Sequence, residues 1–328
     1  MNWIKWIILS ILLVLFTIIL LFTADLVAKK YLGLGQPIVY DAHPLWGYAP
    51  RANSSYKRFD GDVVTINEVG TRSISGWNSE GKNILFLGDS ITYGGSYIDD
   101  DQTFASLVCE NFVDWSCQNA GVNSYGIINI VTRSRYDERI NQAPLRVITF
   151  ITADFDRGLR SKNTAHFILR SPPRYLSGLW EIGNFLSSYI NPKGWFGKQD
   201  QRTLNNLVSA QEQNLNRQFA LDILKTEIDR LEAESFNYLL VHSPSQEELT
   251  NLSLIEENEI LNLLKSRYSE HFLSLHEFLL SPYQEGKEQL YRDHVHFEEE
   301  GHQVVANAIS LKISNSFGEN PNFILSPP

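Results

Sequence analysis

The sequence has little of several features that would define a class of protein. It contains only two cysteines, Cys109 and Cys117, in 328 residues, and two thiols cannot by themselves form a tetrahedral zinc site. Its 28 basic residues are outnumbered by 38 acidic ones, which gives a net charge of −10. This balance argues against a general nucleic-acid binder, which would need a basic face. Internal repeats are also missing, as are low-complexity runs outside the N-terminus.

One long apolar run lies at the N-terminus, and no second run of its length follows. No residue is charged between Lys5 and Asp25, and a helix of this length spans a hydrocarbon core of about 30 Å. Trp3 and Trp6 are placed as interfacial anchors. A cleaved signal peptide is the alternative, but its apolar region would be shorter and a small-residue cleavage site would follow it. We therefore predict an uncleaved transmembrane anchor over residues 1–25.

The charges that flank this run are nearly balanced. Lys5 lies on one side and Lys29 and Lys30 lie on the other, so the positive-inside rule does not decide the orientation. We expect a cytoplasmic N-terminus, because a short tail need not cross the membrane, and a periplasmic or extracellular globular part. In an exported body Cys109 and Cys117 could pair, whereas in the cytoplasm they would be buried thiols. Both alternatives stay open.

Composition divides the rest of the chain. Residues 26–80 hold prolines and glycines that rule out a long helix, and we interpret them as a connector with short strands that packs on the main domain. That domain is expected over residues 81–315, followed by a tail at 316–328. Within it, residues 158–205 are rich in aromatic residues, proline and glycine. This favours a lid-like insertion over a disordered loop, and an amphipathic patch on the membrane is the alternative.

Apolar runs of strand length alternate with helical patterns along the main domain. The expected strands are residues 84–87, 145–152, 236–242 and 271–275, and the expected helices are residues 103–112, a segment from 126 onward, 206–234, 254–268 and 301–313. Such alternation predicts an α/β sandwich with a parallel sheet.

A polar turn follows the first of these strands and contains Asp89 and Ser90. In α/β sheets, ligands bind just beyond the carboxyl ends of the strands. Ser90 would lie on the turn into a helix, close to backbone N–H groups that can stabilise an oxyanion. We therefore interpret Ser90 as a nucleophile. The alternative is that Ser90 only caps the helix.

A second polar cluster precedes the last expected helix. Asp293 and His296 are three residues apart, a spacing at which the carboxylate can hold the imidazole tautomer while the other ring nitrogen takes a proton from a serine. Together with His294 and His302 they are also possible metal ligands, and chance surface histidines are a third interpretation. We prefer the catalytic one, because no matching His or Cys cluster occurs elsewhere in the chain.

These blocks together resemble the SGNH (GDSL) hydrolase family. The resemblance is carried by the Gly-Asp-Ser that ends at Ser90, by the glycine at Gly121, and by Asp293-x-x-His296, and it covers about residues 80–315. It implies a flavodoxin-like three-layer α/β/α sandwich and acyl-ester hydrolysis or acyl transfer without a metal or another cofactor. It further implies that Ser90 is the nucleophile, His296 the base and Asp293 the orienting acid, with the N–H groups of Ser90 and Gly121 in the oxyanion hole.

One position departs from the family's pattern. The family's third block reads Gly-x-Asn-Asp, and the side chain of its Asn completes the oxyanion hole. The matching place here has Ala153 followed by Asp154. Loss of one such donor lowers the rate by about 10²–10³. Either another donor serves, with Asn123 as a candidate, or the enzyme is slow, or the chemistry has been lost.

We predict a membrane-anchored serine esterase or O-acyltransferase that acts on acyl esters, such as acetyl esters, of a glycan or a lipid-linked sugar through an acyl-enzyme on Ser90. Its expected partners are an acylated glycan or a small ester substrate and, through the N-terminal helix, the membrane; no nucleic acid is expected. The alternative is a catalytically impaired protein of the same fold that binds cell-surface polysaccharide, which Ala153 supports. A metallohydrolase is the third possibility.

Overall fold

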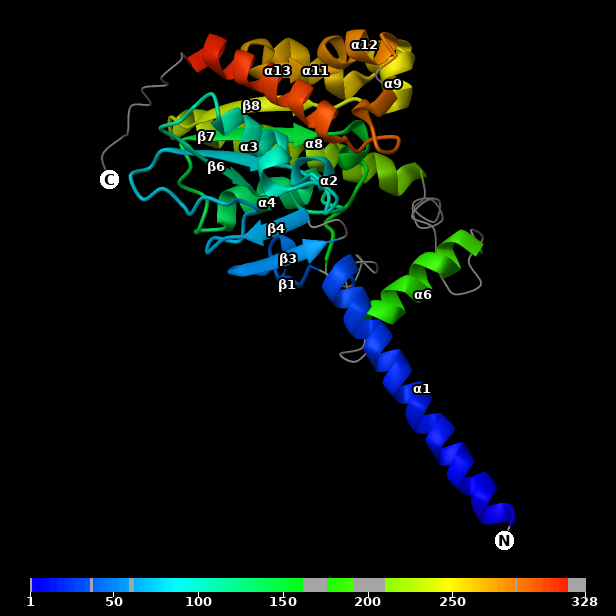
Figure 1. Cartoon of the computed structure of the whole chain (residues 1–328). Coiled ribbons are helices and arrows are strands. Elements are labelled where there is room, and N and C mark those ends of the chain that lie inside the picture. The colour runs from blue at the N-terminus through cyan, green and yellow to red at the C-terminus, as the bar shows by residue number, and fades with distance from the viewer. Residues whose placement is uncertain are drawn as a thin grey trace.

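The computed structural model describes residues 2–35, 38–58, 62–161, 176–190, 210–286 and 288–317. Its centre is a five-stranded sheet in the order β6-β5-β7-β8-β9, in which all neighbouring strands are parallel (Figure 1). The strands are β5 (Asn83–Leu87), β6 (Ser116–Asn119), β7 (Leu145–Phe150), β8 (Asn237–His242) and β9 (Phe272–Ser274). The carboxyl ends of these strands therefore meet at one edge of the sheet.

Alternate residues of each strand face two separate hydrophobic cores. In β5, Leu85 and Leu87 contribute to the core that holds the buried residues of α4 (Ile127–Tyr136) and α8 (Ala210–Ala233). Ile84 and Phe86 contribute to the core that holds those of α3 (Phe104–Cys109) and α13 (Glu299–Phe317). A strand that is buried on both faces must be apolar throughout. The predicted three-layer α/β/α sandwich is confirmed.

The remaining helical elements of the domain are short. They are α2 (Ser90–Tyr93), η1 (Asp100–Gln102), η2 (Thr152–Phe155), α9 (Gln246–Thr250), α10 (Ser253–Glu256), α11 (Glu259–Arg267), η3 (Ser269–His271), α12 (His276–Gln284) and η4 (Glu288–Leu290). The N-terminal connector folds into two antiparallel hairpins, β1 (Tyr40–His43) with β2 (Gly47–Pro50), and β3 (Ser54–Arg58) with β4 (Asp62–Ile66).

Two helical segments differ from the sequence predictions. The helix expected over residues 254–268 is interrupted, because Asn258 takes an extended backbone and its side chain accepts the N–H groups of Ile260 and Leu261, which starts α11 anew. The loop expected after β9 contains α12, which carries Pro282 inside it. Proline removes an intrahelical hydrogen bond, so the sequence pattern there did not indicate a helix. Residues 206–209 of another expected helix lie outside the described residues.

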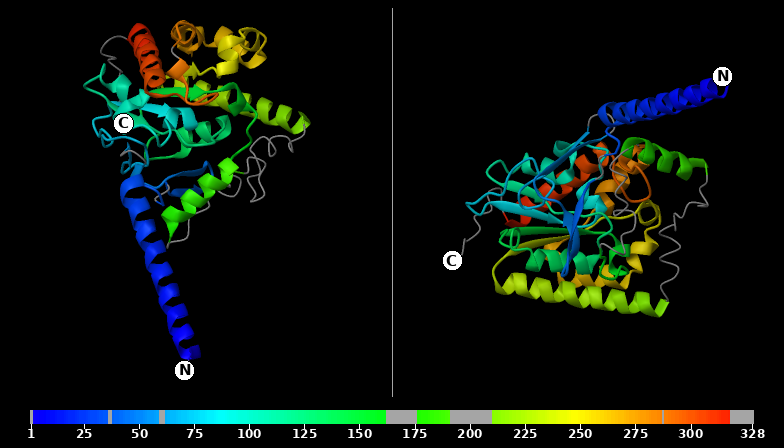
Figure 2. Two further views of the ribbon diagram at one scale, coloured as in Figure 1. Left: turned by 45° about the vertical axis from the view of Figure 1, so that its right-hand side comes forward. Right: turned by 90° about the horizontal axis from the view of Figure 1, so that it is seen from below.

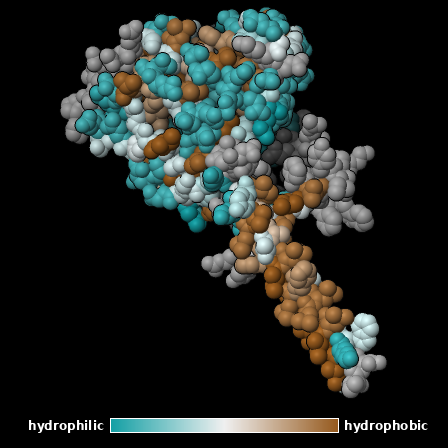
Figure 3. Space-filling view, viewed as in Figure 1, coloured by the Kyte–Doolittle hydropathy of each residue, from teal (hydrophilic) through white to brown (hydrophobic). Residues whose placement is uncertain are grey.

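The N-terminal helix α1 (Asn2–Leu32) continues past the predicted boundary at residue 25. It is long and apolar enough to cross a membrane by length and composition, and none of its apolar window is buried. Figure 3 shows this apolar surface projecting from the more polar body. In the views of Figure 2 its C-terminal end lies beside α6 (Ser177–Ile190), where Asp25 accepts the N–H groups of Gly178 and Leu179. Residues 162–175 and 191–209, which make up much of the predicted lid at 158–205, lie outside the described residues.

A disulfide joins Cys109 at the end of α3 to Cys117 in β6, with 5.8 Å between the two Cα atoms. Of the two states that the sequence left open for these cysteines, the structure has the paired one. The two cysteines are separated by 8 positions, and the disulfide restricts the unfolded chain by closing this loop. In the chain-entropy account this raises the free energy of unfolding by about 2–3 kcal/mol.

We predict that replacing both Cys109 and Cys117 with alanine lowers the free energy of unfolding by about 2–3 kcal/mol, measured by chemical denaturation of the full chain in detergent. Reductant should produce a similar loss in the wild type and none in the double variant. An unfolding curve of the wild type that is insensitive to reductant would contradict this expectation.

Candidate active site

Ser90 is held at the carboxyl end of β5 by a tight turn. A Cβ atom at Gly88 would lie 2.0 Å from the Thr92 hydroxyl oxygen and 2.7 Å from the Thr149 carbonyl oxygen, so this turn requires glycine. Asp89 caps α2 by accepting the Ile91 N–H at 2.9 Å. The cap is therefore Asp89, and the interpretation of Ser90 as the cap is wrong. Ser90 is the first residue of α2, where backbone N–H groups have no intrahelical acceptor.

The structure brings Ser90 together with His296 and Asp293. The Ser90 Oγ lies 2.7 Å from the His296 Nε2, although the two residues are 206 positions apart. The His296 Nδ1 lies 2.7 Å from the Asp293 Oδ2. The other carboxylate oxygen of Asp293 accepts the backbone N–H groups of Val295 and His296 at 3.0 and 2.9 Å. The carboxylate is thereby fixed in orientation, and it fixes the imidazole in turn.

The charge state of Asp293 determines the tautomer of His296. Partial burial alone would raise the pKa of Asp293, but the hydrogen bonds from the His296 imidazole and from the two backbone N–H groups lower that pKa well below its usual range. An ionised carboxylate can only accept hydrogen bonds, so the Nδ1 of His296 carries a proton. The Nε2 is then left to accept the Ser90 hydroxyl proton. By geometry this is the arrangement of a serine hydrolase.

Tyr97 connects the two halves of this arrangement. It lies on the segment after α2, and its hydroxyl donates to the Phe297 carbonyl oxygen at 2.9 Å. The Arg292 guanidinium lies over the Tyr97 ring, 4.1 Å from its centroid, and the backbone N–H of Arg292 donates to the His296 carbonyl oxygen at 2.8 Å. The segments that carry Ser90 and His296 are therefore joined by more than the catalytic contact.

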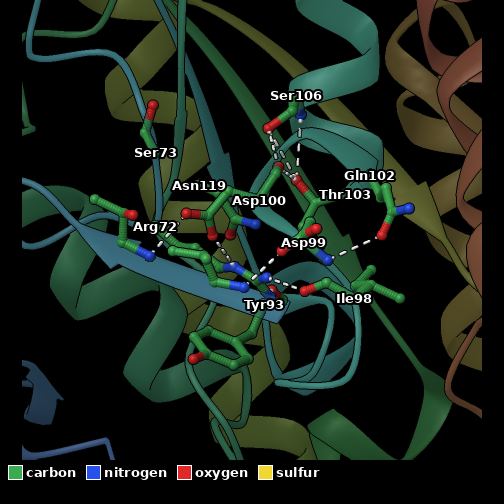
Figure 4. Close-up of polar contacts among 12 residues, drawn as sticks. Arg72, Ser73, Tyr93, Ile98, Asp99, Asp100, Gln102, Thr103, Ser106 and Asn119 are labelled. Atoms are coloured by element: carbon green, nitrogen blue, oxygen red, sulfur yellow. Dashed lines mark hydrogen bonds and ion pairs between the residues drawn. The ribbon is translucent and has the colours of Figure 1, made fainter. Parts of the chain in front are cut away.

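A buried arginine from the connector holds the segment between α2 and η1. Arg72 donates to the Asp100 carboxylate at 2.7 Å and to the carbonyl oxygens of Tyr93 at 2.9 Å and Ile98 at 2.7 Å, and it also contacts the Gly95 carbonyl oxygen. Figure 4 shows the side chain reaching from its own segment into this turn. The role of Arg72 could not be predicted from the sequence, because its partners are mostly backbone carbonyl groups that leave no sequence pattern.

A cavity of about 870 Å³ opens beside Ser90 and His296. Asn123 and Ala153, the residues at issue for the oxyanion hole, both line it. Gly121 is not among the lining residues, and its N–H donates to the Asn119 side chain at 3.0 Å. For Gly121 to donate to an oxyanion, its N–H would have to leave the Asn119 side chain.

Arg157 forms a buried charge cluster next to the nucleophile. Its Nη1 lies 3.2 Å from the Asp89 carboxylate and 2.5 Å from the Asp154 carboxylate, and it donates to the Tyr125 carbonyl oxygen at 2.6 Å. Burial, reinforced by the charge of Asp89, raises the pKa of Asp154 well above its usual range. Arg157 thus ties the residue before Ser90 to η2. The spacing of Asp154 and Arg157, three residues apart, is the sequence signal that could have indicated this ion pair.

The four residues that the sequence offered as metal ligands, Asp293, His294, His296 and His302, do not surround a common point. His302 is buried in α13, where its Nδ1 accepts the Phe104 N–H at 3.2 Å. The side chain of His294 is 78% exposed. Among the described residues, no group of three or more His, Cys, Asp or Glu side chains is arranged to hold a metal ion.

Models of known protein families and curated protein sequences gave no match to this chain. Similar solved structures include a lipolytic G-D-S-L family protein from Veillonella parvula, with 14% identity over 72% of this chain and 97% of that chain and a TM-score of 0.39. A lipase/acylhydrolase from Enterococcus faecalis has 15% identity over 71% and 96% of the two chains and a TM-score of 0.43. A variant of Axe2, an acetyl-xylooligosaccharide esterase from Geobacillus Stearmophilus, has 14% identity over 71% and 94% and a TM-score of 0.44.

The parallel sheet with helices on both faces is the layered fold that the resemblance to the SGNH (GDSL) family implies. Members of that family are among the similar solved structures.

We predict that Arg72→Leu destabilises the fold by about 3–5 kcal/mol, because it leaves the Asp100 carboxylate buried without its partner. Arg51→Leu is the matched control, since Arg51 and Asp41 are both more than half exposed and such pairs contribute about 0–1 kcal/mol. The measurement is the free energy of unfolding by urea. Equal losses in the two variants would be inconsistent with a structural role for Arg72.

We also predict a stability change with pH that depends on His302. Burial, assisted by the charge of Arg72, lowers the pKa of His302 to about 3. Between pH 6.5 and pH 3 the unfolded chain therefore binds a proton that the folded chain does not, so stability falls as the pH falls through this window. From pH 6.5 to pH 5 the loss is about 2 kcal/mol. His302→Asn retains an acceptor for the Phe104 N–H but has no imidazole to protonate. Between pH 6.5 and pH 5 this variant should therefore lose about 2 kcal/mol less stability than the wild type. Identical pH slopes would refute the assignment.

Proposed function

We propose that this chain is a serine esterase or O-acyltransferase that acts through an acyl-enzyme on Ser90. The observation that carries the proposal is the unbroken series of contacts from the Ser90 Oγ through the His296 imidazole to the Asp293 carboxylate, each 2.7 Å long. A hydroxyl, an imidazole and an ionised acid in this order form the Ser-His-Asp arrangement that activates a serine nucleophile.

In the proposed reaction the Ser90 Oγ attacks the carbonyl carbon of an ester while its proton moves to the His296 Nε2. Asp293 stabilises the imidazolium that forms. The tetrahedral intermediate then expels the alcohol, which takes the proton from the Nε2, and an acyl-Ser90 ester remains. Water or a second hydroxyl group gives a proton to the same nitrogen and attacks the acyl group. The bond between the acyl carbon and the Ser90 Oγ then breaks, and the His296 Nε2 returns its proton to the Oγ. The product is a free acid when water attacks and a new ester when a sugar hydroxyl attacks.

The negative charge on the intermediate needs donors in the cavity. The Ser90 N–H at the start of α2 is one proposed donor. Asn123 is the second, since it lines the cavity where Ala153 provides no polar group. Gly121 is the third and needs its N–H released from Asn119. This set replaces the asparagine that the family pattern places at Ala153.

The shape and charge of the cavity support an acylated glycan as the substrate. A volume of about 870 Å³ lies within the range of small-molecule sites, about 300–1,000 Å³. Its lining includes the acidic residues Asp156, Glu247 and Glu248 and a single arginine, Arg157. An excess of acidic groups disfavours an anionic sugar. We therefore propose a neutral acyl sugar, either in a glycan or linked to a lipid.

The location follows from the N-terminal helix and the disulfide. We propose that α1 is a single-pass membrane anchor with a cytoplasmic N-terminus, and that the catalytic domain is periplasmic or extracellular. The disulfide between Cys109 and Cys117 supports this side of the membrane, because disulfides persist in oxidising compartments.

A polysaccharide-binding protein without activity is the second candidate, and Ala153 is the observation that favours it. The two candidates make opposite predictions for the nucleophile. A binder needs the cavity but does not need the Ser90 hydroxyl, whereas the enzyme needs both.

We predict that the full chain in detergent hydrolyses p-nitrophenyl acetate and that Ser90→Ala lowers kcat/KM by about 10⁴-fold or more. Ser266→Ala, an exposed serine on α11, is the control and should leave the rate unchanged. EDTA should have no effect if the reaction runs without a metal. A wild-type chain without turnover, or a Ser90→Ala variant that retains it, would remove the enzymatic proposal.

A further inference from the structure

The hairpin that follows the membrane helix contacts the wall of the cavity beside Ser90. Tyr48 in β2 donates its hydroxyl to the Asn123 carbonyl oxygen at 2.7 Å. The Asn123 Nδ2 donates to the Tyr40 hydroxyl oxygen, from β1, at 3.0 Å. Asn123 is therefore held at its backbone and at its side chain by two tyrosines from the connector, and both tyrosines are buried.

Asn123 and Ser90 line the same cavity because the pairing between their two segments continues beyond the sheet. The Ala120 N–H donates to the Phe86 carbonyl oxygen, and the Val122 N–H donates to the Gly88 carbonyl oxygen at 3.1 Å. This places the residue after Val122 beside the turn that carries Ser90. Among the hydrogen bonds of the described residues, the Asn123 Nδ2 donates only to the Tyr40 hydroxyl oxygen, and Asn123 is among the residues that line the cavity.

The backbone at this point is constrained. Ser124 has a φ of +66°, a conformation that costs a non-glycine residue free energy and persists only where the surroundings enforce it. The next residue, Tyr125, packs its ring edge-to-face on that of Tyr48 with 5.3 Å between centroids, and Tyr40 packs on Tyr48 in the same way at 5.6 Å. The hairpin and the 121–126 loop are thus one packed unit.

The tip of the hairpin is also fixed against the domain. Gly47 has a φ of +84°, and a Cβ there would lie 1.9 Å from the Arg160 carbonyl oxygen. The Asn129 side chain in α4 donates to the carbonyl oxygens of both Trp46 and Arg160. If the hairpin moved, its tip would lose the contacts with Arg160 and Asn129, and its tyrosines would lose the contacts with Asn123.

Arg157 is a weaker candidate for the missing donor. Its Nη1 is already shared by the Asp89 and Asp154 carboxylates and the Tyr125 carbonyl oxygen. An oxyanion would have to compete with two carboxylates for that charge. Asn123 has no such competitor, because its partner at Nδ2 is a neutral hydroxyl group.

We infer that Tyr40 and Tyr48 are positioning residues of the active site: they orient Asn123 so that its amide serves as the oxyanion donor that Ala153 lacks. The connector after the membrane helix is then a structural part of the catalytic centre and not a spacer. This inference rests on the proposed function, because it assigns the hairpin a role in the same reaction.

The test uses the full chain in detergent and the hydrolysis of p-nitrophenyl acetate. Asn123→Ala should lower kcat by about 10²-fold or more, the effect of removing one oxyanion donor. Tyr40→Phe and Tyr48→Phe each remove one neutral hydrogen bond and should lower kcat about five- to tenfold with KM unchanged. Tyr136→Phe, a half-exposed tyrosine on α4, is the matched control and should match the wild type.

A double-mutant cycle separates positioning from a general structural role. If Tyr40 acts through Asn123, adding Tyr40→Phe to Asn123→Ala should cause no further loss of kcat. Asn123→Asp, which keeps the shape of the side chain, serves if the alanine variant does not fold. Wild-type kcat in Tyr40→Phe, or losses that simply add in the double variant, would overturn the inference while leaving the proposed function intact. Failure of the wild type to turn over would instead remove the proposed function and the inference with it.

Discussion

The hydrogen bond between the Ser90 hydroxyl and the His296 imidazole is the contact on which the rest of the site depends. It joins two residues 206 positions apart at 2.7 Å, so it forms only if β5 and the segment before α13 are held at the same edge of the sheet. The apolar packing of α13 against α3 and the sheet supplies that constraint. The contact matters for chemistry because a serine hydroxyl is a weak nucleophile without an adjacent base.

The N-terminal segment contacts two of the segments that surround Ser90. Arg72 fixes the turn after α2 from one side, and the β1–β2 hairpin fixes the loop at Asn123 from the other. The same segment continues from α1, the helix with the length and composition of a membrane span. The β1–β2 hairpin, which follows α1 in the chain, therefore contacts the loop that lines the cavity beside Ser90.

Much of the fold and the reactive groups could be predicted from the sequence, because both leave local patterns. Buried strands such as β5 are continuous apolar runs, and Ser90, Asp293 and His296 lie at the ends of recognisable elements. The supporting residues leave no such pattern. Arg72 binds backbone carbonyl groups from a distant segment, and the pairing of Tyr48 with Asn123 spans 75 positions. Their roles depend on tertiary packing, which a single sequence does not encode in its periodicity.

Reaction of the full chain with a fluorophosphonate, followed by mass spectrometry of the digested protein, tests the central claim most directly. This reagent reacts with a serine whose hydroxyl is activated by a base. The account predicts a single modified serine, Ser90, and loss of that modification in His296→Ala, because the imidazole accepts the Ser90 proton. Modification at another serine, or modification of Ser90 at the wild-type rate in His296→Ala, would contradict it.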